Sequence, residues 1–364
     1  MRVLIAAGGT GGHIYPGIAV AKEILRREPK SEIRFVGTAR GLENKLVPQA
    51  GFELSLIDSA GLKNVGPVAR ARGLLVLPKS MLAARALIKS FRPDVVIGAG
   101  GYVSGPVLLT AAVRRLPTLV MESNAQPGWT NRVLARFVDK AAVSFAAALP
   151  YFQGKAVVTG NPVRREFFEI PPRERDATGM GQFSILVFGG SQGAHAINEA
   201  MIAALPALAG LKDVLRISHQ TGEKDFETVL SGYLVAGWGE RASVTKYIDN
   251  MVAAFAAADL VVSRAGATTT AELIAAGKAS LMVPFPFAAD DHQRRNAEAL
   301  EQAEAGRMIL QQDLNGERLA QEIATLIREP DRISEMEQAA RKLARGDAAA
   351  AVVDLIEKLV SRRQ

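Results

Sequence analysis

The stretch VLIAAGGTGGH, residues 3–13, decides the fold of the first half of the chain, and SILVFGGSQGAH, residues 184–195, repeats its plan in the second half. Each stretch begins with a short apolar run that is typical of a buried strand and continues into a glycine-rich turn that opens a helix. About half of the 364 residues separate the two. This offset predicts two similar Rossmann-like domains.

Other apolar runs of strand length alternate with helical patterns, which predicts α/β architecture with parallel sheets that are covered on both faces. The expected strands are residues 3–7, 32–36, 95–97, 118–121, 184–188, 214–217, 260–262 and 280–283. The expected helices include Gly17–Arg27 and a C-terminal helix over Ala348–Leu359, with Asp347 placed to cap it. The proline-rich segment Thr159–Gly181 is typical of a linker between domains.

The amino-acid composition excludes several classes of protein and several kinds of site. Hydrophobic residues make up 48% and charged residues 22%, which excludes a disordered or fibrous protein. Cysteine is absent, so there is no disulfide, thiol nucleophile or cysteine metal site, and four histidines leave little for a metal cluster. The net charge of +7 favours an anionic partner such as nucleic acid, a phosphorylated substrate or a membrane surface.

The first glycine loop is not a dinucleotide fingerprint, because Ile14 stands where the third glycine belongs. No acidic residue for a ribose directly follows the second expected strand, and no P-loop motif occurs. What remains is a turn whose backbone N–H groups face anions at a helix N-terminus, with His13 beside it. A lone histidine is commonly structural, but its place beside this loop favours a functional role.

The segment Ser263–Glu272 also follows an expected strand and opens a helix. N–H groups at Ala267–Thr269 are suited to cradle a pyrophosphate. Glu272 either stabilises the helix N-terminus or accepts hydrogen bonds from a ribose diol. Asp290 and Asp291 are expected to cap a helix, and the absence of a D-x-D triplet leaves a metal–diphosphate site without evident ligands.

The stretch Val65–Phe91 interleaves apolar residues with lysines and arginines. It is either an ordinary helix that packs on a sheet or a basic, apolar patch for a membrane surface. The uncharged run Val95–Val113 has transmembrane length, but its internal glycines and proline predict a strand, a turn and a helix start instead.

Six segments together resemble the MurG family of glycosyltransferases, in family order and over nearly the whole chain. They are residues 8–16, 98–106, 159–164, 189–194, 263–272 and 290–297. The resemblance implies the GT-B fold, two Rossmann-like domains with parallel sheets facing a cleft. It implies an acceptor and membrane domain over residues 1–160, completed by the helix 346–364, and a donor domain over residues 161–345.

The resemblance also implies an activity and its partners. The expected reaction transfers N-acetylglucosamine from UDP-GlcNAc to lipid I, with inversion, and makes β-1,4-linked lipid II for peptidoglycan. The expected location is the cytoplasmic face of the bacterial inner membrane, as a peripheral protein on an anionic surface. Cell-wall synthesis proteins are candidate partners, and the expected biological roles are cell-wall biogenesis, cell shape and cell division. No cofactor and no metal are expected. The alternatives are a UDP-GlcNAc 2-epimerase and a nucleic-acid binder. The second is disfavoured by the absence of recognition motifs and by aromatics of only 6%.

Most of the implied donor-binding residues lie at the two glycine loops and along the helix expected after residue 266, and the others lie in separate segments. They are Thr10, Gly11, Gly12, Asn124, Arg164, Ser191, Ile248, Ala267, Thr268, Thr269, Thr270, Ala271, Glu272 and Gln293. Arg164 and Ser191 are implied at the donor phosphates, and Ile248 at uracil. Glu272 is implied at the ribose diol and Gln293 at the sugar hydroxyls.

One segment departs from the family pattern. The family usually has His-Glu-Gln-Asn where this chain has Met121-Glu122-Ser123-Asn124. Met121 cannot transfer a proton, so an essential histidine at this position is excluded. His13 is therefore the stronger candidate for the general base, with Glu122 in reserve.

Overall fold

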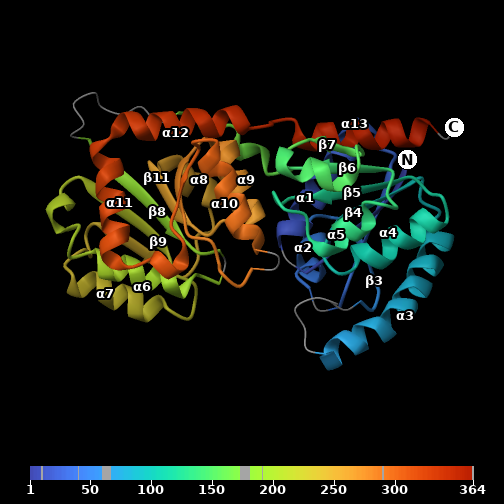
Figure 1. Ribbon diagram of the computed structural model, residues 1–364, viewed down its shortest axis with the longest axis horizontal. Coiled ribbons are helices and arrows are strands. Elements are labelled where there is room, and N and C mark those ends of the chain that lie inside the picture. Colours follow the sequence, from blue (N-terminus) through green and yellow to red (C-terminus); the bar gives the residue numbers. More distant parts are fainter. Residues whose placement is uncertain are drawn as a thin grey trace. The chain divides into compact units, whose positions relative to one another are not determined.

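The structure is a computed structural model of the chain. It describes residues 1–9, 11–39, 41–59, 67–172, 181–190, 192–288 and 291–362, and within 67–75 it describes the backbone only. The chain forms two compact units (Figure 1). Unit 1 consists of residues 1–163 together with residues 347–364, and unit 2 consists of residues 164–346.

Unit 1 is built on a seven-stranded parallel sheet with the order β3-β2-β1-β4-β5-β6-β7. The strands are β1 (Arg2–Ala7), β2 (Glu32–Gly37), β3 (Glu53–Leu56), β4 (Val95–Gly100), β5 (Thr118–Glu122), β6 (Lys140–Val143) and β7 (Ala156–Val158). Alternate residues of β1 enter two cores: Val3 and Ile5 face one layer, Leu4 and Ala6 the other. The sheet is therefore buried on both faces, as its apolar strands predict.

Two groups of helices cover this sheet. On the face of Val3 and Ile5 lie α1 (Gly11–Arg27), α2 (Glu43–Gln49) and the C-terminal α13 (Ala348–Ser361). On the face of Leu4 and Ala6 lie α3 (Pro67–Phe91), α4 (Ser104–Val113) and α5 (Trp129–Leu134).

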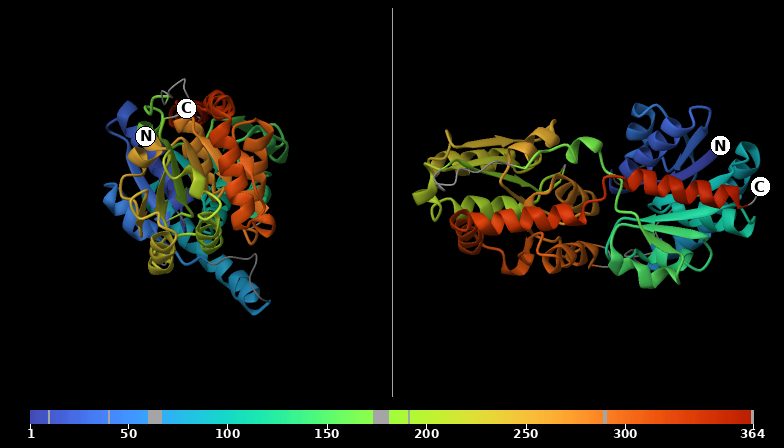
Figure 2. Two further views of the ribbon diagram at one scale, coloured as in Figure 1. Left: turned by 90° about the vertical axis from the view of Figure 1, so that its left-hand side faces the viewer. Right: turned by 90° about the horizontal axis from the view of Figure 1, so that it is seen from above.

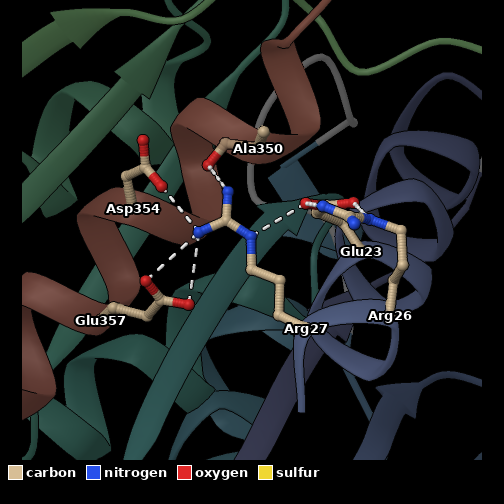
Figure 3. Close-up of polar contacts among 6 residues, drawn as sticks. All are labelled: Glu23, Arg26, Arg27, Ala350, Asp354 and Glu357. Carbon is tan, nitrogen blue, oxygen red and sulfur yellow. Dashed lines mark hydrogen bonds and ion pairs between the residues drawn. The ribbon is translucent and has the colours of Figure 1, made fainter. Parts of the chain in front are cut away.

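The C-terminal helix α13 belongs to the core of unit 1 although it follows unit 2 in the sequence. Val352, Val353 and Ile356 are fully buried against the α1 side of the sheet. Arg27, at the end of α1, fixes the helix from outside (Figure 3). Its guanidinium donates to the carboxylate of Asp354 at 2.7 Å and to the carbonyl oxygen of Ala350 at 3.1 Å.

Unit 2 repeats the plan with a six-stranded parallel sheet in the order β10-β9-β8-β11-β12-β13. Its strands are β8 (Phe183–Phe188), β9 (Leu215–Gln220), β10 (Ala242–Thr245), β11 (Leu260–Ser263), β12 (Ala279–Met282) and β13 (Arg307–Met308). Its helices are α6 (His195–Ala204), α7 (Phe226–Val235), α8 (Met251–Ala257), α9 (Ala267–Ala276), α10 (His292–Gln302), α11 (Gly316–Arg328) and α12 (Pro330–Leu343), and they cover the sheet on both faces (Figures 1 and 2).

Short 3₁₀ segments complete the two units: η1 (Ala146–Phe152) in unit 1, and η2 (Arg165–Phe167), η3 (Ala209–Leu211) and η5 (Gln311–Asp313) in unit 2. The predicted fold of two Rossmann-like domains with parallel sheets is confirmed. The run Val95–Val113 forms β4, a turn and α4, as its glycines indicate.

Three local predictions are wrong. The first helix begins at Gly11 rather than Gly17, because burial of Ile14 and Pro16 outweighs the low helix propensity of the glycines. Asp347 precedes α13 but its side chain makes no capping hydrogen bond. Asp291 precedes α10 in a left-handed conformation (φ 55°) and makes no side-chain cap either, while Asp290 lies outside the described residues.

Candidate active site

The strand order of unit 2 reverses between β8 and β11, which are neighbours in the sheet. In open α/β sheets ligands bind at this point, beyond the carboxyl ends of the strands. The glycine loop 189–194 follows β8, and residues 264–266 lead from β11 into α9. Two anion-binding loops predicted from the sequence therefore meet at the edge of one sheet.

Gln220, at the end of β9, links the glycine loop to the segment around Ile248. Its side-chain amide donates to the carbonyl oxygen of Gly190 at 2.9 Å and accepts from the backbone N–H of Ile248 at 2.8 Å. A uracil that pairs with this N–H of Ile248 must therefore displace Gln220. Ser191, implied at the donor phosphates, lies outside the described residues.

The N-terminus of α9 offers donors to an anion. The N–H groups of Thr268 and Thr269 lie in the first turn, where a helix supplies no acceptor. The buried hydroxyl of Thr268 has no hydrogen-bond partner among the described residues. The hydroxyl of Thr270 lies 3.1 Å from the carbonyl oxygens of both Gly266 and Ala267, and its N–H donates to Gly266, so Thr270 serves the helix itself. Its neighbour Ala271 follows within the same helix.

Glu272 lies one turn into α9 and pairs with Arg164. Their charged atoms are 3.6 Å apart, with Glu272 13% exposed and Arg164 47% exposed. Burial raises the pKa of Glu272 to about 7, although Arg164 opposes the shift. The guanidinium of Arg164 also lies 4.9 Å from the ring centre of Phe167. A carboxyl group with a pKa of about 7 thus lies beside a half-exposed cation.

Gln293 lies in the first turn of α10, near the residues that follow β12. Its side-chain oxygen accepts from the N–H of Phe285 at 3.0 Å, which fixes the orientation of its amide group. Arg264 ties the end of β11 to this segment by donating to the carbonyl oxygens of Val283 and Pro284 at 3.0 and 3.2 Å. Sequence reasoning did not single out Arg264 or Gln220.

Unit 1 has its own reversal of strand order, between β1 and β4. The glycine loop after β1 continues into α1, whose first residues are Gly11, Gly12 and His13. The half-buried ring of His13 lies directly against Gly100 at the end of β4, where a side chain on residue 100 would collide with it. Thr10, between the two halves of this loop, lies outside the described residues.

Glu122 ends β5 and is buried, with four hydrogen-bond donors around its carboxylate. One oxygen accepts from the backbone N–H of Asn124 at 2.8 Å and from its side chain at 3.0 Å. The other accepts from the N–H of Gly128 at 3.0 Å and from the side chain of Asn131 at 2.9 Å. Burial raises the pKa of Glu122. The neighbouring Met121 is a buried core residue.

A second buried carboxylate, Glu43 at the start of α2, contacts the first glycine loop and was missed by sequence reasoning. It accepts from the N–H of Gly9 at 2.9 Å and from the N–H and hydroxyl of Thr38 at 2.8 and 2.9 Å. The signal in the sequence was the acid in Gly41-Leu42-Glu43, six residues beyond a buried strand and next to a glycine.

The predicted site residues thus form two groups. His13, Gly11, Gly12, Glu122 and Asn124 belong to unit 1, and the other described ones belong to unit 2. No cluster of three or more His, Cys, Asp or Glu that could hold a metal occurs in the part of the chain that the structure describes. Within the same residues, every helix is too short or too polar to cross a membrane.

Comparison with known proteins identifies the family. Residues 3–143 match the glycosyltransferase family 28 N-terminal domain, and residues 184–356 match its C-terminal domain. A protein of Citrifermentans bemidjiense, named UDP-N-acetylglucosamine--N-acetylmuramyl-(pentapeptide) pyrophosphoryl-undecaprenol N-acetylglucosamine transferase, is 49% identical over 97% of this chain and 98% of its own length. The Geobacter sulfurreducens protein of the same name is 47% identical over the full length of both chains.

Solved structures give the same result. The crystal structure of Acinetobacter baumannii MurG has a TM-score of 0.81 and 33% identity, covering 98% of this chain and 99% of that one. A UDP-GlcNAc 2-epimerase from Neisseria meningitidis has a TM-score of 0.71 over 98% of this chain and 100% of that one, but only 13% identity, so it shows the shared fold alone. The chain therefore belongs to glycosyltransferase family 28 and, within it, to the MurG family.

Proposed function

We propose that the protein transfers N-acetylglucosamine from UDP-GlcNAc to the 4-hydroxyl of the N-acetylmuramic acid of lipid I, which yields lipid II for peptidoglycan. The proposal rests on identities of 49% and 47% to transferases of that name, over nearly the full length of the chains. The site of unit 2 supports it independently, because Thr268, Thr269 and Glu272 offer a diphosphate cradle next to a carboxylate for a ribose. An epimerase is disfavoured by its low identity.

Leaving-group stabilisation falls to α9 in this mechanism. As the acceptor hydroxyl attacks the anomeric carbon, negative charge develops on the departing UDP. The N–H groups of Thr268 and Thr269, the hydroxyl of Thr268 and the helix dipole are fixed donors for that charge. Such fixed dipoles need no reorganisation during the reaction.

We assign the general base to His13 rather than Glu122. A carboxylate has about four lone-pair positions, and four donors occupy those of Glu122. A base must keep a position for the substrate proton. Glu122 instead fixes Asn124, for which we propose a contact with the transferred sugar.

The decisive experiment incubates the protein with UDP-GlcNAc and a lipid I analogue, with and without EDTA. We expect UDP and a β-1,4-linked disaccharide product in both cases. His13→Ala should lower kcat by about 10²–10⁴-fold and leave the UDP dissociation constant nearly unchanged, since a base acts in the transition state. Epimerised UDP-sugar without acceptor would contradict the proposal.

We also propose that unit 1 docks on an anionic membrane through the outer side of α3, α4 and α5. Neither these helices nor the residues that directly follow α4 and α5, through 116 and 138, contain Asp or Glu. Their exposed side chains combine apolar groups with cations: Leu82, Val113, Trp129, Val133 and Phe137, with Arg85, Lys89, Arg114, Arg115 and Arg136. The buried Ala84, Ile88 and Phe91 show that α3 also packs on the sheet. Leu75 lies among the residues whose side chains are not described.

Vesicle co-sedimentation tests this surface. Arg85→Glu and Leu82→Ser should each weaken binding to anionic vesicles, with about 1 kcal/mol lost per cation removed. Lys358→Glu on α13, at the opposite face of the unit 1 sheet, makes the same charge change as a control. Lys79 is less suited because it pairs with Asp58 at 2.7 Å. Equal effects of Arg85→Glu and Lys358→Glu would remove this surface from the proposal.

A further inference from the structure

The residues that begin α2 hold Gly9 at both of its backbone groups. The carboxylate of Glu43 accepts from the N–H of Gly9 at 2.9 Å, and the N–H of Leu42 donates to the carbonyl oxygen of Gly9 at 3.3 Å. Gly9 has φ +88°, which side-chain-bearing residues rarely adopt. A flexible glycine in an unusual conformation is thus fixed by contacts from a segment more than 30 residues away.

Glu43 is itself held rigidly. Its side chain is fully buried, and its other oxygen accepts from the N–H and the hydroxyl of Thr38, directly after β2. The side chain fills the space beside Gly41, where any further side chain would collide with it. Its position is therefore set by the sheet, and it transmits that position to the glycine loop.

The loop held in this way leads directly to His13. His13 is four positions after Gly9 in the sequence, and α1 starts between them at Gly11. On the other side, Gly101 lies directly against the carbonyl of Gly8, and Gly100 lies against the ring of His13. Movement of the loop relative to β4 therefore displaces the imidazole.

The contact also decides which loop donors face a ligand. Because the N–H of Gly9 is taken by Glu43, it does not serve as a donor to a phosphate, whereas the N–H groups in the first turn of α1, at Gly11 and Gly12, are suited to that role. A buried carboxylate behind an anion-binding loop is unfavourable for anion affinity. Its presence is explained by positioning rather than by charge.

We propose that Glu43 is a positioning residue of the transferase reaction, which acts through Gly9 to fix the first glycine loop and His13. This rests on the proposed function and on the assignment of His13 as base. Displacing a reacting group by about 1 Å can cost 10²-fold in rate. Glu43→Gln keeps the shape but turns an amide NH₂ toward either Gly9 N–H or Thr38 N–H, so one donor loses its acceptor.

The test compares wild type, Glu43→Gln, Thr38→Val and Asp139→Asn. Thr38→Val removes only the hydroxyl contact to Glu43. Asp139 is the matched control, because its carboxylate also accepts from the N–H and hydroxyl of one threonine, Thr118, both at 2.8 Å. Thr118 begins β5, so this contact lies at the edge of the sheet opposite to the site.

We expect Glu43→Gln to lower kcat by about ten- to a hundredfold while the KM for UDP-GlcNAc stays within about twofold of wild type. Amide hydrogen exchange of a peptide spanning residues 5–14 should accelerate. Thr38→Val should give a smaller change in the same direction, and Asp139→Asn should match wild type in both measurements. A lower kcat with an unchanged KM in Glu43→Gln, together with wild-type behaviour of Asp139→Asn, distinguishes a positioning role from a general loss of structure.

A Glu43→Gln protein with a kcat within about threefold of wild type, or with unchanged exchange in residues 5–14, would overturn the proposal. If Glu43→Gln does not fold, Thr38→Val decides, and wild-type values for that variant overturn it. A wild-type protein that transfers no sugar refutes the proposed function instead. The exchange measurement then still tests whether Glu43 holds the loop.

Discussion

Glu272 shows how burial prepares a single side chain for its ligand. Its pKa is raised to about 7, so near neutral pH it exists in both forms. The ionised form accepts hydrogen bonds from both hydroxyls of a ribose more strongly than the protonated form, which uses one oxygen as a donor. Arg164, at 3.6 Å, favours that form and is exposed enough to move toward a phosphate when a donor binds.

Donor affinity should therefore fall as the pH is lowered. A carboxyl with a pKa of about 7 is mostly protonated at pH 6, so UDP-GlcNAc should bind about tenfold more weakly at pH 6 than at pH 8. Calorimetry at the two pH values measures this change.

Variants of Glu272 test the same contact. Glu272→Gln should bind UDP-GlcNAc more weakly than the wild type at both pH values, with a flatter pH dependence. Glu272→Ala should lose about ten- to a hundredfold in affinity. A wild-type affinity independent of pH would show that Glu272 does not contact the donor.

Glu122 is a carboxylate whose four contacts hold the segment that follows β5 together. Glu122→Gln would face one pair of donors with an NH₂ group and leave them unsatisfied. We expect a loss of about 1–3 kcal/mol in the free energy of unfolding, measured by denaturant titration. The fall of kcat toward acidic pH should have the same midpoint in Glu122→Gln as in the wild type, because Glu122 is not the base in this proposal. A stable variant that loses this fall of kcat would identify Glu122 as the base after all.

At the scale of elements, eight strands were predictable because short apolar runs are a strong local signal, and β8 begins one residue before its predicted start. The strands β3, β6, β7, β10 and β13 were not predicted, because each spans only two to four residues and lacks a long apolar run. Helix starts were harder. Gly11 and Gly12 have low helix propensity, and only the packing of Ile14 and Pro16 places them in α1.

The positions of two candidate binding loops were also predictable. The loops at residues 189–194 and 264–272 carry local motifs, and the sequence places them correctly at the edge of a sheet. Glu43 and Gln220 were not predictable, because their contacts join segments about 30 residues apart that only the sheet order brings together. Sequence spacing alone does not contain that order.

The attachment of α13 gives a prediction at this scale. Arg27 bonds Asp354, Glu357 and the carbonyl of Ala350 on α13 and Glu23 on its own helix (Figure 3). Arg27→Ala should therefore lower the free energy of unfolding of unit 1 by about 1–3 kcal/mol. The neighbouring Arg26 is the control, because it is exposed and bonds only Glu23 among the residues drawn in Figure 3. Equal stabilities of the two alanine variants would show that the bonds of Arg27 to α13 contribute nothing.

At the scale of the whole molecule, the two units differ in whether one continuous segment of the chain builds them. Unit 2 is one continuous segment, residues 164–346, with a core of its own. The core of unit 1 is completed by α13, which follows unit 2 in the sequence and buries Val352, Val353 and Ile356 against the unit 1 sheet. We therefore expect folding of unit 1 to require α13, and folding of unit 2 to require only residues 164–346.

Dissection of the chain tests this difference. Residues 164–346 alone should unfold cooperatively and bind UDP with an affinity close to that of the full chain, because α9 and both loops proposed to bind the donor lie within them. Residues 1–163 alone should not fold, because their apolar face for α13 stays exposed.

A circular permutation tests the same point from the other side. Met1, Val360 and Ser361 line one shared hollow, so a short linker can join residue 361 to residue 1. The permuted chain that places residues 347–361 ahead of residues 1–163 should then recover a cooperative transition by circular dichroism. Cooperative folding of residues 1–163 without α13 would instead show that α13 is an accessory to the unit 1 core.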